Sequence, residues 1–198
     1  IIGVVADIIQ VEAKYETAIE TALGGNIQNI VTDNESTAKG MIAFLKTNKL
    51  GRATFLPLTS IRNPQKFRNP EVLSEKGVIG TADTLVRIDE RYRDVAASLL
   101  GRIVVADNVD NAVSLAAKYR HSLRIVTLEG ELLVPGGAIS GGAYRNNSNL
   151  LGRRREIEAL EERAKKLYSA IAGINQDIEN TKARRTRMRV DLEAIKNE

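Results

Sequence analysis

Residues 3–24, GVVADIIQVEAKYETAIETALG, decide the fold because a second version of this stretch, GTADTLVRIDERYRDVAASLLG, occurs at residues 80–101. The two stretches align without a gap at a constant offset of 77 residues. The coinciding landmarks are Gly3 with Gly80, Tyr15 with Tyr92, and Gly24 with Gly101. A shared pattern of secondary structure explains part of this similarity, but the coinciding glycines and tyrosines favour an internal duplication.

The match continues after the loss of three residues, at an offset of 74. Asp33-Asn34 then correspond to Asp107-Asn108, which stand where helix N-caps are expected. An apolar helical face follows in each copy, and its members are Ala38, Met41, Ile42 and Leu45, and Ala112, Leu115, Ala116 and Tyr119. Each copy closes on a strand, at residues 53–56 and 125–128. Both copies therefore read strand, helix, strand, helix, strand.

This order predicts a mixed α/β (α+β) protein in which two pseudo-repeated subdomains precede a long coiled-coil helix. We expect subdomain I at residues 1–58 and subdomain II at residues 78–149. Residues 59–77 contain two prolines and few apolar side chains, which indicates a linker over the surface. Residues 150–198 form the expected coiled-coil arm.

The arm carries a heptad pattern, with apolar residues at alternating steps of three and four. The expected seam consists of Ile157, Leu160, Ala164, Leu167, Ile171, Ile174, Ile178, Met188, Leu192 and Ile195. Thr181 and Arg185 occupy seam positions between its two parts, as a register device or as a tolerated flaw. So narrow a seam is buried only against another helix, and no other segment of this chain has a heptad run. We expect the partner helix from a segment preceding Ile1 in a longer chain, or from another chain.

Composition excludes several kinds of chemistry. The 198 residues include no Cys and a single His, His121, which argues against disulfides, thiolate zinc sites, His-based metal sites and a Ser-His-Asp triad. Aromatic residues make up 4% of the chain, too few for a base-stacking platform. No apolar run reaches the roughly 18 residues of a membrane span. We expect no catalytic residue, metal or cofactor, and the absence of Cys fits a reducing compartment.

Residues 130–145, GELLVPGGAISGGAYR, read as a hairpin with two glycine pairs. Gly136 and Gly137 precede Ala138-Ile139, and Gly141 and Gly142 follow. The stretch lacks the Lys-Ser/Thr of a phosphate-binding loop. It is either a tight turn with close backbone approach inside the fold or a flat interface whose exposed strand edge accepts another strand. We favour the interface.

The net charge of +4 lies mostly on the arm, because residues 1–150 contain 17 basic and 16 acidic side chains. Lys182, Arg184, Arg185, Arg187 and Arg189 read as a solvated coiled-coil face. A second cluster, where the arm begins, consists of Arg145, Arg153, Arg154 and Arg155. It is either another solvated face or a contact to the DNA backbone, which would be sequence-independent and sensitive to salt.

Four motifs in this order resemble the hinge of a prokaryotic structural maintenance of chromosomes (SMC) protein. They are GRATFLPL at 51–58, RIVTLEG at 124–130, PGGAISGG at 135–142 and LLGRRREIE at 150–158. The resemblance implies a non-catalytic hinge midway along a chain whose ends form an ATPase head. It implies arms that pair as an antiparallel coiled coil, and a cytoplasmic, nucleoid-associated protein without a membrane anchor.

The resemblance further implies a homodimer whose contact includes Gly136, Gly137, Ala138, Ile139, Gly141 and Gly142. It also implies binding of double- or single-stranded DNA near the start of the coil, which we assign to the junction arginines. An alternative is a small α/β enzyme domain that binds a nucleotide or sugar phosphate and has a helical oligomerisation tail. That alternative requires a concave pocket with convergent polar groups. A basic-zipper DNA reader is disfavoured because Arg185 stands on the seam.

Overall fold

The computed structural model describes residues 1–142 and 150–196, in two compact units, Ile1–Arg154 (unit 1) and Arg155–Glu198 (unit 2). The first copy of the repeat contains β1 (Gly3–Val4), α1 (Val5–Ile8), β2 (Ile9–Val11), η1 (Ala13–Tyr15), α2 (Glu16–Leu23), η2 (Gly24–Gln28), β3 (Ile30–Thr32), α3 (Glu35–Thr47) and β4 (Phe55–Pro57), where η marks a 3₁₀ helix. The helix η3 (Pro70–Ser74) precedes the second copy. That copy contains β5 (Val78–Thr81), η4 (Ala82–Leu85), β6 (Val86–Ile88), η5 (Glu90–Tyr92), α4 (Arg93–Leu100), β7 (Ile103–Ala106), α5 (Val109–Lys118) and β8 (Arg124–Thr127), and the hairpin strands β9 (Leu132–Leu133) and β10 (Ile139–Ser140) follow.

Apart from η2, which has no counterpart in the second copy, the elements of the two copies follow one another in the same order. At the offset of 77 residues, β2, η1 and α2 coincide with β6, η5 and α4. The sequence predicts a single strand before α2, and this is wrong in detail, because the one-turn helix α1 separates β1 from β2. The Asp7 carboxylate accepts a hydrogen bond from the Val4 N–H at 3.1 Å at the start of this turn, and the side chains of Val5 and Ala6 are buried.

Each copy builds its own sheet around one parallel pair of strands. The first sheet has the order β1-β3-β4, and the second has the order β10-β9-β8-β7-β5. β3 pairs with β4 and β7 with β8 in parallel, whereas β1 and β5 are antiparallel to their neighbours β3 and β7. A further antiparallel pair, β2 with β6, joins the two copies directly.

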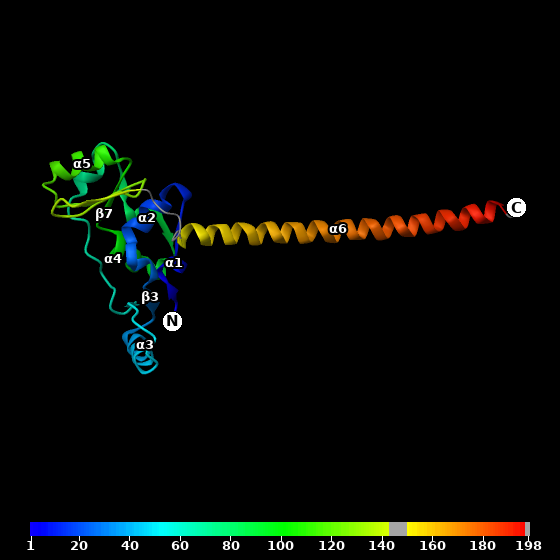
Figure 1. Ribbon diagram of the computed structural model, residues 1–198, viewed down its shortest axis with the longest axis horizontal. Coiled ribbons are helices and arrows are strands. Elements are labelled where there is room, and N and C mark those ends of the chain that lie inside the picture. Colours follow the sequence, from blue (N-terminus) through cyan, green and yellow to red (C-terminus); the bar gives the residue numbers. More distant parts are fainter. Residues whose placement is uncertain (143–149, 197–198) are drawn as a thin grey trace. The chain divides into compact units, whose positions relative to one another are not determined.

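The main hydrophobic core of unit 1 draws on both copies. Ile19 and Leu23 of α2 pack in the same buried cluster as Val95 and Leu100 of α4. A second cluster lies between α5 and the second sheet. Figure 1 shows α3 and α5 at opposite ends of unit 1, with α2 and α4 between them.

The predicted helix boundaries are confirmed at both N-caps. The side-chain oxygens of Asn34 and Asn108 each accept a hydrogen bond at 2.9 Å, from the N–H groups of Thr37 and Asn111. Gly24 ends α2 with a φ of +51°, a conformation that glycine adopts at little cost. Its counterpart Gly101 is required for space and not for a positive φ, because a Cβ atom there would lie 2.5 Å from the carbonyl oxygen of Ala97.

Most residues of the predicted linker are exposed or half-buried, as expected of a surface segment. Val72 in η3 is the exception, because its side chain is fully buried in the second cluster. The boundaries 1–58, 59–77, 78–149 and 150–198 stay a prediction.

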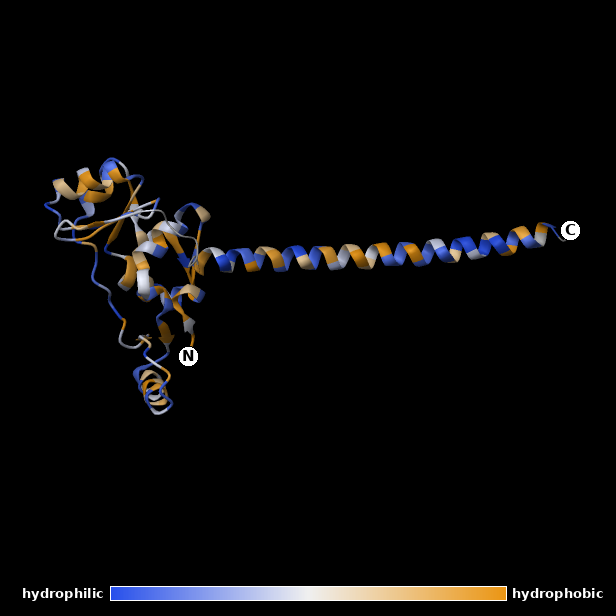
Figure 2. Cartoon of the chain, in the orientation of Figure 1, coloured by the Kyte–Doolittle hydropathy of each residue, from blue (hydrophilic) through white to orange (hydrophobic). Residues whose placement is uncertain are grey.

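The helix α6 (Leu150–Lys196) spans 47 residues and confirms the predicted long helix. Figure 2 shows hydrophobic turns recurring between hydrophilic ones along it. Side-chain interactions along the helix, such as Lys166 with Glu162 and Lys182 with Glu179, connect neighbouring turns.

Candidate functional site

The glycine-rich stretch forms the predicted hairpin at the edge of the second sheet. β10 pairs antiparallel with β9, with Ile139 opposite Leu133 and Ser140 opposite Leu132. The turn between them is fixed to the body, because the Gly136 N–H donates to the His121 carbonyl oxygen at 3.0 Å. Directly before β9, Glu131 forms hydrogen bonds with Thr127 through both its backbone and its carboxylate. These bonds hold the hairpin in one position.

The two glycine pairs serve different purposes. Gly136 and Gly137 have φ values of +96° and +93°, so the turn itself requires them. Gly141 lies against the residue that precedes β9, because a Cβ atom there would be 3.0 Å from Cγ of Glu131. The interpretation as a tight turn with close approach inside the fold therefore holds for these three glycines. It does not account for the exposure of the strand that follows the turn.

The outer edge of β10 is open in the described part of the chain. β10 is the last strand of its sheet, and residues 135–142 are all exposed. The Val134 N–H donates to the Ala138 carbonyl oxygen, so the next pair, Ile139 with Leu133, is a pair without mutual hydrogen bonds. The N–H and C=O groups of Ile139 therefore point to the open edge. Its side chain is 55% exposed.

A second open edge exists in the first copy. β4 and β8 are equivalent strands, but β8 is covered by β9 and β10, whereas β4 ends its sheet. This edge could not be predicted from the sequence, because the residues of a strand indicate only that it is a strand and not which strands pair with it. The one available signal was the lack of a glycine hairpin after residues 53–56.

The segment after β4 is fastened to the start of α3. The Glu35 carboxylate accepts hydrogen bonds from the Thr59 hydroxyl at 2.6 Å and the Ser60 hydroxyl at 2.5 Å. These two bonds lower the pKa of Glu35 to about 2. Neighbouring α3 exposes apolar side chains, Ile42 and Phe44, and Leu50 is exposed just after it.

The junction arginines are only partly described. Arg145 and the side chain of Arg154 lie outside the described residues. Arg153 and Arg155 are exposed on α6. The assignment of these four residues to DNA therefore stays a prediction.

The predicted seam lies on the surface of α6. The seam residues Ile157, Leu160, Leu167, Ile171, Ile174, Ile178, Met188, Leu192 and Ile195 are between 45% and 69% exposed, and Ala164 is exposed too. A row of exposed Ile and Leu side chains at heptad spacing is typical of a helix that pairs with another.

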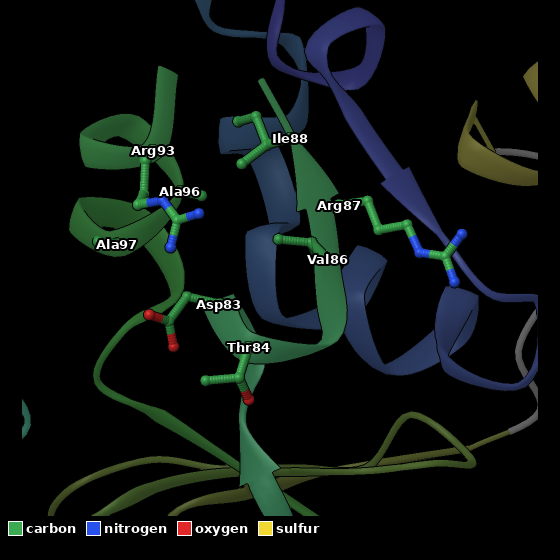
Figure 3. A pocket seen from close by; sticks show the side chains of 8 residues that line it. All are labelled: Asp83, Thr84, Val86, Arg87, Ile88, Arg93, Ala96 and Ala97. Carbon is green, nitrogen blue, oxygen red and sulfur yellow. The ribbon is translucent and has the colours of Figure 1, made fainter. Parts of the chain in front are cut away.

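One pocket bears on the enzyme alternative. It has a volume of about 580 Å³ and lies between β6 and α4, with Val86, Ile88, Ala96 and Ala97 among its lining residues. Figure 3 shows Arg93 and Asp83 on one side of β6 and Arg87 extending from the other. The Arg93 guanidinium is paired with Glu90 at 2.7 Å, and the Thr84 hydroxyl donates to the Thr81 carbonyl oxygen. Arg93 and Thr84 are thus engaged with the protein itself, whereas Oδ1 of Asp83 is buried without a hydrogen-bond partner among the described residues. A single unengaged polar group is not the convergent set that the enzyme alternative requires.

Two features of the described residues bear on other functions. No helix in this part of the chain combines the length and the apolar character needed to cross a membrane. Among the same residues, His, Cys, Asp and Glu side chains nowhere gather in threes in a way that could hold a metal ion.

Comparison with known proteins gives one consistent result. The family model described as "SMC proteins Flexible Hinge Domain" matches residues 1–116. The chromosome partition protein Smc of Bacillus subtilis is 42% identical over 183 residues, which cover 91% of this chain and 15% of that protein. The chain thus spans about one seventh of that relative.

Solved structures agree. The SMC hinge domain of Geobacillus stearothermophilus, crystallised as an asymmetric dimer, has a TM-score of 0.75 at 40% identity and covers 88% of this chain and 71% of that one. The Pyrococcus furiosus Smc hinge domain with an extended coiled coil has a TM-score of 0.59 at 29% identity, covering 96% and 68%. With more than half of its residues matched by the family model, the chain belongs to the SMC flexible hinge family.

Proposed function

We propose that this chain is the homodimerisation hinge of a chromosome condensation and segregation protein. Unit 1 pairs with a second copy of itself, and α6 continues into one of two coiled-coil arms that lead to distant ATPase heads. The dimer of the related Geobacillus stearothermophilus hinge supports this proposal. The parent protein would then act on the nucleoid in the cytoplasm, and the hinge would perform no chemistry.

The observation that carries the proposal is the open edge of β10 with the exposed Ile139. An exposed strand edge with an apolar side chain is a template for pairing with another chain. We assign Gly136, Gly137, Ala138, Ile139, Gly141 and Gly142 to this contact.

The best candidate for the receiving surface is the edge of β4. In the second copy, the equivalent strand β8 already carries two further strands. A β10 strand from the partner would pair with the open edge of β4 and extend the first sheet by one strand. Because a two-fold dimer repeats every contact, β10 of each chain would meet β4 of the other, and the two contacts would close a ring.

The arm requires a partner helix of its own. The exposed seam of α6 would pair antiparallel with a heptad-bearing helix from the segment of the parent chain that leads into the hinge. Burial of about ten apolar side chains would drive this pairing.

We further propose that DNA binds without sequence preference near the start of α6, through Arg145, Arg153, Arg154 and Arg155. Arg153 and Arg155 are exposed, and arginine forms charge-assisted hydrogen bonds with phosphate oxygens.

The dimer is tested by Ile139→Glu, which places a charge on the open edge without disturbing the turn glycines. We expect sedimentation equilibrium to show a loss of dimer of at least tenfold in affinity. Val113→Glu, an equal change on the exposed face of α5, is the matched control and should leave the dimer intact. A full-strength Ile139→Glu dimer contradicts the assignment. Substitution of Gly136 or Gly137 is less informative, because the positive φ alone would strain any other residue.

The DNA assignment is tested with the double variant Arg153→Gln/Arg155→Gln. The control is Arg184→Gln/Arg187→Gln, which removes the same number of charges from the same helix. Binding to two duplexes of unrelated sequence is measured by fluorescence anisotropy at several salt concentrations. We expect the first variant alone to weaken binding, and equally for both duplexes. Discrimination between the sequences, or equal effects of the two variants, would contradict the assignment.

A further inference from the structure

The near-neutral charge of residues 1–150 conceals a sharp separation along the chain. Residues 1–35 contain six acidic side chains and one Lys. Residues 36–70 contain no Asp or Glu, and their seven cationic side chains are Lys39, Lys46, Lys49, Arg52, Arg62, Lys66 and Arg68. Lys66 and Arg68 flank Phe67, which packs on the cluster of α5 and the second sheet. We therefore restrict the name α3 basic surface to the four cations on α3 and in the turn after it, Lys39, Lys46, Lys49 and Arg52.

All seven side chains are available to a ligand. Each residue is exposed, and none forms an ion pair within 4.0 Å with another described residue. Elsewhere in unit 1 several cations are paired with carboxylates, namely Lys14, Arg87, Arg91, Arg93 and Lys118. Arg62 acts on Glu35 only at longer range.

The structure brings several of these cations together. Lys46 and Arg52 line one surface hollow of about 400 Å³, together with Ile42 and Gly51. Lys39 precedes Lys46 by two helical turns and therefore lies on the same face of α3. Figure 1 shows α3 at one end of unit 1.

The turn that joins these residues is well defined. The Lys49 N–H donates to the Lys46 carbonyl oxygen, and the Leu50 N–H donates to that of Leu45. Gly51, with a φ of +86°, then directs the chain back towards β4. The hydrogen bonds from Thr59 and Ser60 to Glu35 hold the returning segment against the start of α3. Lys46 and Arg52 are thus held by an ordered backbone.

We propose that the α3 basic surface binds the sugar–phosphate backbone of duplex DNA. Exposed cations with no carboxylate among them match a polyanion, since a protein partner of mixed charge would meet repulsion here. Three of the four cations of this surface are lysines, which act as point charges towards phosphate and do not by themselves read bases. The proposal extends the DNA-binding part of the proposed function to a surface that does not include the junction arginines.

Counterion release sets the size of the effect. Each neutralised phosphate adds about 0.9 to the slope of log affinity against log salt. Four contacts at this surface would therefore weaken binding by roughly 100-fold between 50 and 200 mM salt.

The test compares two triple variants with the same change in net charge. Lys39→Gln/Lys46→Gln/Arg52→Gln removes the centre of the α3 basic surface. Lys76→Gln/Arg120→Gln/Arg124→Gln removes three exposed cations elsewhere in unit 1. Anisotropy with a mixed-sequence duplex is measured over a salt series, and sedimentation equilibrium records the dimer.

We expect the first variant to lose at least tenfold in affinity at low salt, to reduce the salt slope by about 3, and to keep its dimer. We expect the second to change affinity by less than threefold. Equal losses in both variants would show that only net charge matters and would overturn the proposal. So would unchanged binding, binding confined to Arg153 and Arg155, or a dissociated dimer, which would assign the surface to the second copy. Failure of the Ile139→Glu test would remove the proposed dimer contact and leave this result unaffected.

Discussion

Gln10 and Arg87 stand opposite each other at the centre of the β2–β6 pair, and they are the same position of the internal repeat. Their neighbours exchange places around them, with Ile9 opposite Ile88 and Val11 opposite Val86. The two copies therefore meet about a local two-fold axis, as two identical subunits do in an isologous dimer. The duplication is thus built into the packing of unit 1, and its core is shared between the copies.

Equivalent positions of the repeat should nevertheless differ in their contribution to stability, because they are buried to different extents. Ile9 is 1% exposed, whereas its counterpart Val86 is half-buried beside the pocket between β6 and α4. Ile9→Ala should lower the free energy of unfolding by about 2–5 kcal/mol, through lost burial and the cavity left behind. Val86→Ala should cost distinctly less. Urea denaturation measures both, and the exposed Gln10→Ala, which should stay within about 0.5 kcal/mol of wild type, is the control. A Val86→Ala cost equal to that of Ile9→Ala would contradict the prediction.

Two glycines should respond to alanine in opposite directions. Gly40 lies within α3, and a Cβ atom there would meet nothing within 4 Å. Gly40→Ala should therefore raise the free energy of unfolding by about 0.5–1 kcal/mol. At Gly101 the added Cβ would lie 2.5 Å from the Ala97 carbonyl oxygen, so Gly101→Ala should destabilise by about 1–3 kcal/mol. Thermal denaturation distinguishes the two signs, and a stabilising Gly101→Ala would show that the end of α4 yields easily.

The repeat, the caps and the long helix could be predicted because they depend on local patterns. Asn34 and Asn108 can be identified from their place before an apolar helical face, and residues 157–195 from their heptads. The one-turn helix α1 could not, because Val5 and Ala6 read equally well as part of a strand, and only their burial in the shared core decides.

The site was harder to predict for two reasons. Whether a strand such as β4 is an edge depends on which strands the rest of the chain adds to the sheet, and no pattern within residues 55–57 records this. The α3 basic surface is hidden in the net charge of residues 1–150, because the acidic residues of the first 35 cancel it. A running count over shorter windows would have found it.

Removing the side chains of the two equivalent N-cap residues should have different effects, one on global stability and the other on local fraying. Asn108→Ala should lower the free energy of unfolding by about 0.5–2 kcal/mol, because α5 packs Ala112, Leu115 and Ala116 into a buried cluster. In α3 only Ala38 is buried, so Asn34→Ala should instead cause local fraying. Hydrogen exchange of the α3 amides should quicken in Asn34→Ala with little change in global stability. A global loss as large as that of Asn108→Ala would show that α3 folds as part of the core.

Glu35 should give the stability of the chain a specific dependence on pH. Its pKa in the folded chain is lowered to about 2 by the hydroxyls of Ser60 and Thr59, from an ordinary value of 4.5. Because the folded pKa is depressed, the carboxylate contributes its full stabilisation above pH 4.5 and loses it progressively as the pH falls towards 2. Wild type should therefore exceed Glu35→Gln in free energy of unfolding by a constant amount near neutral pH, and the difference should shrink across that window. Urea denaturation at a series of pH values measures it. Glu129→Gln, which removes an exposed carboxylate with no hydrogen bond to another described residue, is the matched control. A difference for Glu35→Gln that stays constant down to pH 2 would show that the two hydroxyls bind carboxylate and amide equally well, and that the charge of Glu35 has no part in holding the segment after β4 to α3.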